Sequence, residues 1–272
     1  MITGVIQNMT DETYDKAEGI RRSDLFLISK TPLHFKYALE HPREASTELE
    51  FGTAAHKYIL EPEDFWNEYE LCPEINKRTK AGKQEWEEFV AYCEGNKKKP
   101  LTTQDYKEIL ALDDAFRYAP FAKQLLTGKH EVPFFWTDTE TGVKCKCKPD
   151  CLTVYEGRPL IVDYKTTRSC ADGHFERACR EYGYKLQVGM YVEGLFNNTF
   201  EEYGFAFVAQ EKAPPYAIRV YMCDDSFIDE GRMLFHDLLG IYHMCEENNR
   251  FYGYEGPFNM PTDLVGDLIK LE

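Results

Sequence analysis

The sequence has no excess of basic residues. Its 272 residues include 47 aspartates and glutamates against 32 lysines and arginines, so the formal net charge is −15. This composition excludes a protein that coats nucleic acid nonspecifically, because contacts to phosphates need lysine and arginine. A local site that binds divalent ions could still present positive charge to a phosphate, so phosphate chemistry stays open.

Segments for export or membrane insertion are also lacking. We find no signal peptide and no apolar run of membrane length, and we therefore expect a cytoplasmic protein without a membrane partner. The nine cysteines are then expected to be free thiols. Cys145 and Cys147 lack the two-residue gap typical of zinc and iron–sulfur sites, and no matching pair follows, so no iron–sulfur cluster is expected.

The first 130 residues are predicted to be mainly helical. Ser23 is a candidate N-cap for a helix over residues 24–28, and Thr31-Pro32 is typical of the start of a helix over residues 33–39. Further helical patterns cover residues 52–60, 79–94 and 103–126, and a lysine-rich segment, Lys97–Lys99, is interpreted as a solvated loop between the last two.

Residues 131–222 have the pattern of a sheet. Three antiparallel strands are expected over residues 132–136, 143–154 and 160–165, followed by a helix over 184–196, strands over 203–209 and 216–222, and a terminal helix over 225–247. This order predicts an α/β (α+β) fold with a mixed central sheet flanked by helices. We expect one domain over residues 1–272, made of a helical N-terminal extension (1–130), a catalytic sheet core (131–222) and a C-terminal helix and tail (223–272).

The most informative pattern is Pro149-Asp150 followed, after twelve residues, by Asp163-Tyr164-Lys165. Side chains alternate along a strand, so Asp163 and Lys165 are expected side by side at the end of an apolar, buried strand. Two carboxylates and one ammonium can then converge. Oxygen ligands of this kind suit Mg²⁺ or Mn²⁺ and indicate a metal site for phosphodiester cleavage.

The same alternation applies to the segment before Asp150. It places Lys144, Lys146, Lys148 and Asp150 on one face of a strand, opposite Cys145 and Cys147. We expect this face to be solvated and positive. The lysines are therefore candidate DNA contacts, with plain solvation of an outer face as the alternative.

These residues carry a family resemblance. Gly52-x-x-x-His56, Glu131, Pro149-Asp150, Asp163-Tyr164-Lys165 and the segment from Gln187 to Tyr191 together resemble the RecB-like branch of the PD-(D/E)xK nucleases. The segments 19–23 and 28–32 are similar, more narrowly, to the nuclease domain of RecE-type phage and prophage exonucleases. The resemblance implies a core like that of restriction endonucleases.

The resemblance also implies roles for individual residues. Asp150 and Asp163 would ligate the metal together with the backbone carbonyl of Tyr164, and Glu131 and His56 would complete the site or hold a second ion. Lys165 would position the attacking water or stabilise developing charge, while Gln187 and Tyr191, one helical turn apart, would orient ligands or a phosphate. Candidate contacts to a terminal 5′ phosphate are Arg22, Ser23, Ser29 and Lys30.

Three functional classes follow. The leading one is a metal-dependent 5′-to-3′ exonuclease of double-stranded DNA in phage-type recombination, which resembles ring-forming homo-oligomers and leaves 3′ strands for an annealing protein. The second is another RecB-like nuclease, of DNA repair or CRISPR adaptation, but many such relatives carry a four-cysteine cluster and only Cys223 and Cys245 follow Tyr191. The third is a non-catalytic DNA-end-binding module, against which the intact Asp150, Asp163 and Lys165 argue.

Overall fold

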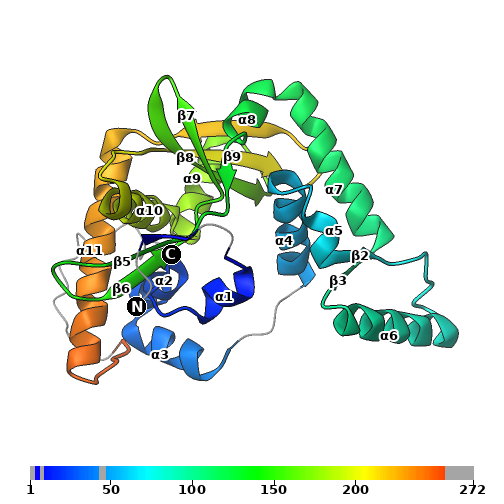
Figure 1. Cartoon of the computed structure of the whole chain (residues 1–272), viewed down its shortest axis with the longest axis horizontal. Coiled ribbons are helices and arrows are strands. Elements are labelled where there is room, and N and C mark those ends of the chain that lie inside the picture. Colours follow the sequence, from blue (N-terminus) through cyan, green and yellow to red (C-terminus); the bar gives the residue numbers. More distant parts are fainter. Residues whose placement is uncertain (1–3, 7–8, 43–46, 255–272) are drawn as a thin grey trace.

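The computed structural model describes residues 4–6, 9–42 and 47–254 (Figure 1). None of the helices in this part of the chain is both long and apolar enough to cross a lipid bilayer. The elements up to residue 125 are β1 (Gly4–Val5), α1 (Asp11–Lys16), α2 (Arg22–Lys30), α3 (Pro32–Glu40), α4 (Thr47–Leu60), α5 (Phe65–Glu68), β2 (Tyr69–Leu71), α6 (Lys80–Gly95), β3 (Lys99–Leu101), α7 (Thr103–Ala115), a 3₁₀ turn (Phe116–Tyr118) and α8 (Pro120–Leu125).

A five-stranded mixed sheet forms the centre of the molecule. Its strands are β4 (Lys129–His130), β7 (Cys151–Tyr155), β8 (Arg158–Thr167), β9 (Gly204–Glu211) and β10 (Ile218–Met222), in the spatial order β10-β9-β8-β7-β4. Strands β8 and β9 are parallel, and the other pairs are antiparallel. Parallel neighbours need a long crossover, which α9 (Asp172–Glu181) and α10 (Tyr184–Thr199) provide. The predicted mixed α/β fold is confirmed.

Helices cover both faces of this sheet, and β8 contributes to both cores. Ile161 packs in the cluster that includes α10 and α11 (Asp225–Glu247), whereas Val162 and Tyr164 pack on the other face with residues of α4 and α8. Alternation along the strand therefore places Asp163 and Lys165 on the same face as Ile161. This is the face that α10 covers.

The expected strand over residues 143–154 is wrong, because it is two strands in different sheets. β6 (Lys144–Cys147) pairs with β5 (Phe134–Thr137), and with β1 they form a separate three-stranded sheet, while β7 belongs to the central sheet. The break contains Pro149, which lacks an N–H for a strand ladder and restricts the residue before it. Asp150 therefore lies at the crossing between two sheets, not on the strand that carries the lysines.

The helical predictions have mixed outcomes. Thr31 caps α3, with its hydroxyl 3.3 Å from the His34 N–H, and the terminal helix has the expected bounds. Ser23 is not the N-cap of α2: the helix begins at Arg22, and Asp24 accepts a hydrogen bond of 2.8 Å from the Arg21 N–H. The expected helix over residues 103–126 is interrupted before Pro120. The segment Lys97–Lys99 is partly strand, and residues 255–272 of the expected tail lie outside the described residues.

Helices α10 and α11 cross at two glycines. A Cβ atom at Gly189 would lie 2.0 Å from the backbone carbonyl carbon of Gly231, so neither helix can carry a side chain at this point without moving. Close contact here holds α10 against the sheet with its polar Gln187 facing β8.

Candidate active site

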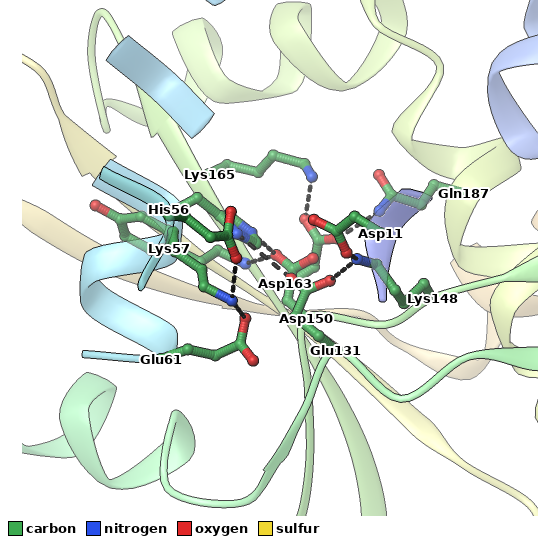
Figure 2. Close-up of polar contacts among 12 residues, drawn as sticks. Asp11, His56, Lys57, Glu61, Glu131, Lys148, Asp150, Asp163, Lys165 and Gln187 are labelled. Carbon is green, nitrogen blue, oxygen red and sulfur yellow. Dashed lines mark hydrogen bonds and ion pairs between the residues drawn. The ribbon is translucent and has the colours of Figure 1, made fainter. Parts of the chain in front are cut away.

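Three carboxylates meet across three neighbouring strands: Glu131 directly follows β4, Asp150 directly precedes β7, and Asp163 lies within β8. In the antiparallel register, Cys151 of β7 lies opposite Val162 of β8 and opposite His130 of β4. One residue further, Asp150 faces Asp163 on one side, and on the other its carbonyl accepts a 3.2 Å hydrogen bond from the Glu131 N–H. Directly opposed positions bring Cβ atoms within about 5 Å, so the sheet register itself assembles the site (Figure 2).

Asp163 is fully buried on β8. Its Oδ2 accepts a short hydrogen bond from the Gln187 side-chain amide on α10, and its Oδ1 contacts the Lys165 ammonium. The prediction that Asp163 and Lys165 lie together is confirmed, and so is the approach of Gln187. Tyr191 is on the same helix, with burial and the nearby Asp163 charge raising its pKa.

Asp150 connects β8 to the helix α4. Its Oδ2 accepts a 2.8 Å hydrogen bond from the Tyr164 backbone N–H and lies 2.7 Å from His56 Nε2. The Tyr164 ring points to the other face, where its hydroxyl donates to Gln210 at 2.6 Å. The predicted role of the Tyr164 carbonyl as a ligand stays a prediction.

Glu131 completes the group from an unusual backbone conformation. Its φ is +51°, in the left-handed region that a non-glycine residue rarely adopts. The carboxylate lies 3.5 Å from His56 Nδ1 and 2.7 Å from Lys148 Nζ. One ligand atom each from His56, Glu131 and Asp150 lies within 4.8 Å of the other two, which makes this trio a candidate metal site.

Burial and repulsion between carboxylates shift the protonation equilibria of the site. Burial and the Asp150 charge raise the pKa of Glu131 to about 7 and that of Asp163 to about 6. Burial acts against ionisation of Asp150 too, but the adjacent His56 holds its pKa below the usual value. Burial opposes protonation of His56, yet the Asp150 charge raises the His56 pKa to about 9. A divalent cation would relieve this repulsion, and the oxygen-rich donor set fits Mg²⁺ or Mn²⁺.

The expected solvated lysine face is wrong. Lys146 is only 2% exposed, and its ammonium donates to the carbonyls of Tyr14, Asp15 and Ala17 at the end of α1, at 2.7, 3.3 and 2.5 Å. Lys144 pairs with Glu18 at 2.6 Å. The segment around α1 lies over this strand and binds its lysines. These contacts join residues far apart in the sequence, so the alternation of side chains along the strand could not predict them.

Lys148 is the one member of this group that reaches the site. Its ammonium bridges Glu131 and Asp11 of α1, at 2.7 Å from each carboxylate. Asp11 is therefore a neighbour of the site that the sequence did not indicate (Figure 2). A second missed neighbour is Lys57, which lies beside His56 and pairs with Glu61 and Glu68 at 2.8 Å. The i,i+4 spacing of Lys57 and Glu61 was its only sequence signal.

Of the four candidate phosphate contacts on α2, the structure brings Arg22 toward the site. Arg22 Nη1 donates to the Tyr182 carbonyl at 3.0 Å, two residues before Tyr184, whose ring centroid is 5.3 Å from Lys165 Nζ. Ser29 instead donates to the Phe26 carbonyl at 2.8 Å, and the Lys30 ammonium lies 5.1 Å from the Phe26 ring. Ser23 lies in the first turn of α2.

Comparison with known families identifies the domain. A family model described as a PDDEXK-like domain of unknown function, DUF3799, matches residues 22–257. The chain belongs to this family. The predicted PD-(D/E)xK fold is thereby confirmed, and the matched DUF3799 range contains every residue of the carboxylate group described above except its outer neighbour Asp11.

One solved structure has a similar fold. A crystal structure from Eubacterium rectale, described as that of a candidate exonuclease, is 19% identical, covers 90% of this chain and 88% of its own, and has a TM-score of 0.61. At this identity the likeness shows the fold. A structure named SSO0001 is 15% identical, covers 84% of this chain and 81% of its own, and has a TM-score of 0.37, which carries no argument. No curated protein sequence matches the chain.

Proposed function

We propose that this protein is a metal-dependent deoxyribonuclease, with residues 1–272 forming one nuclease domain. The observation that carries the proposal is the convergence of Asp150, Asp163 and Glu131 with Lys165 on a PD-(D/E)xK fold. Burial opposes ionisation of all three carboxylates, and the Asp150 charge further opposes that of Glu131 and Asp163, although each has a cationic neighbour in His56, Lys148 or Lys165. Such an arrangement is typical of sites that use a cation.

The position of each residue in the site suggests its role in phosphodiester cleavage. A bound Mg²⁺ or Mn²⁺ supplies an activated water and neutralises charge at the phosphate. Asp150 and Asp163 would hold the ion, with Glu131, His56 and the Tyr164 carbonyl as further ligands. The Tyr164 N–H and Gln187 fix the two aspartates. Lys165 is placed beside Asp163, where its ammonium can orient the water or stabilise charge on the phosphoryl oxygens.

The finer proposal is a 5′-to-3′ exonuclease of double-stranded DNA ends, of the RecE type, acting as a homo-oligomer with an annealing partner in phage-type recombination. It is supported by the resemblance of the segments 19–23 and 28–32 to RecE-type exonucleases and by the contact of Arg22 with the Tyr182 carbonyl, two residues before the Tyr184 ring beside Lys165. The E. rectale protein of similar fold is described as a candidate exonuclease, which agrees with the same class.

The test is digestion of linear duplex DNA labelled at either the 5′ or the 3′ ends, with Mg²⁺, Mn²⁺ or a chelator. We expect metal-dependent release of nucleotides from 5′ ends and no cleavage of a closed circular duplex. Release from 3′ ends or cutting of the circle would keep the nuclease and refute the RecE-type assignment. Absence of cleavage with every metal and DNA form, together with retained binding of DNA ends, would instead support the non-catalytic binding module.

A further inference from the structure

An exposed aromatic ring stands next to the candidate active site. Tyr182, between α9 and α10, is 50% exposed. Its ring centroid is 5.9 Å from that of Tyr184, and the Tyr184 centroid is in turn 5.3 Å from Lys165 Nζ. Tyr182 is thus separated from the catalytic ammonium by a single buried ring.

The backbone under this ring is held firmly. Gly183 has φ +65°, and a Cβ there would lie 2.5 Å from the Phe26 ring, so only glycine fits the junction. Arg22 donates to the Tyr182 carbonyl at 3.0 Å. Helix α2 therefore contacts the junction from two positions, which fixes the backbone that carries the exposed ring.

The charges around the ring favour a nucleic-acid ligand. Arg22 has no carboxylate partner within the described part of the chain, whereas Lys144, Lys146 and Lys148 are engaged by residues in and just after α1. The exposed carboxylate of Glu181 directly precedes Tyr182. We therefore do not expect a net positive charge at the junction to attract the ligand. The junction offers a flat π surface beside the Arg22 guanidinium, whose charge is not neutralised by a described carboxylate, the combination on which bases of single strands stack.

We propose that Tyr182 is a stacking platform for a nucleobase of the bound strand, close to the scissile phosphate. The proposal rests on the proposed nuclease function. The ligand class is a DNA strand end whose base is accessible to stacking, and the ring sets the position of that base while Lys165 and the metal site act on the phosphate. Stacking on aromatic side chains tolerates all four bases, so Tyr182 would contribute affinity without sequence preference.

The test compares Tyr182→Ala and Tyr182→Phe with the matched control Phe200→Ala. Phe200 is 81% exposed at the other end of α10, about 24 Å along the helix. Substrates are a short duplex and a set of duplexes with one abasic nucleotide at successive positions from the end. KM and kcat for cleavage, and Kd in Ca²⁺, are measured after circular dichroism confirms folding.

We expect Tyr182→Ala to raise KM and Kd on the order of 5- to 100-fold on intact DNA, with parental values for Tyr182→Phe and Phe200→Ala. On the DNA with its abasic nucleotide at the stacking position, the parent should lose the same factor, and Tyr182→Ala should lose nothing more. Parental constants for Tyr182→Ala, or an equal loss on every abasic substrate, would overturn the platform while the parent still cleaves. If the parent neither cleaves nor binds DNA, the nuclease proposal fails and the platform falls with it.

Discussion

Replacing Lys146 by methionine should destabilise the protein strongly. The methionine keeps most of the apolar stem but removes an ammonium that donates to three carbonyls at the end of α1. These carbonyls lie at the C-terminal end of α1, where the Ala17 N–H also donates to Tyr14 at 3.2 Å, and a hydrogen bond from a charged donor contributes about 1.5–3 kcal/mol. Burying the ammonium costs part of this sum, as the lowered pKa of Lys146 shows. A net loss of about 2–4 kcal/mol is expected.

For a domain of this size the loss corresponds to a fall in unfolding midpoint of roughly 5–15 °C, measurable by circular dichroism. The matched control is Lys144→Met on the same strand. Its ion pair with Glu18 is exposed, so the change in unfolding free energy should stay within about 0.5 kcal/mol. A Lys146→Met protein as stable as the Lys144→Met protein would show that α1 does not depend on this anchor and would return Lys146 to the candidates for DNA contact.

Three further predictions concern the site and its scaffold. Asp163→Ala should leave a folded protein with DNA cleavage reduced by on the order of 10²-fold or more, and Mg²⁺ or Mn²⁺ should raise the unfolding midpoint of the parent but not of this variant; an equal rise in both would contradict the metal site. Arg22→Ala should reduce the preference for 5′-phosphorylated over 5′-hydroxyl ends several-fold, judged by the ratio of kcat/KM values, and an unchanged ratio would remove the phosphate role. Gly189→Ala should cost about 3 kcal/mol or more in urea unfolding because its Cβ would meet the Gly231 backbone at 2.0 Å, whereas Gly95→Ala, with open space around it, should cost nothing.

The strand that carries Asp163 and Lys165 was predictable because its sequence pattern is compatible with only one placement in the sheet. Leu160, Ile161 and Val162 form an uninterrupted apolar run, so the strand had to be central, and alternation then placed Asp163 and Lys165 together. Periodicity failed at Pro149 for a physical reason. The alternation of side chains between two faces holds only along one continuous strand. Proline ends β6 at this point, and the chain continues as β7 in another sheet with a new register.

His56 and Glu131 could be proposed only from the family resemblance. The hydrogen bond between His56 and Asp150 joins residues 94 positions apart, and no local pattern contains such a contact. The left-handed backbone of Glu131 is equally invisible in sequence, because glutamate has no preference for that conformation. Local chemistry therefore predicted the strand that holds the site, and tertiary structure decided which side chains join it.

The acidic composition and a phosphate substrate are compatible because the two act over different distances. Charges on the exposed surface are screened beyond about 8–10 Å at physiological salt, so a net charge of −15 acts mainly on the first encounter with DNA. Asp150 and Asp163, by contrast, are 7% and 0% exposed. A divalent ion held by these carboxylates would meet a phosphate at contact distance and with little screening. Lys144 and Lys146 are engaged away from the site, so the positive charge closest to the carboxylates comes from His56, Lys148 and Lys165, to which a bound ion would add.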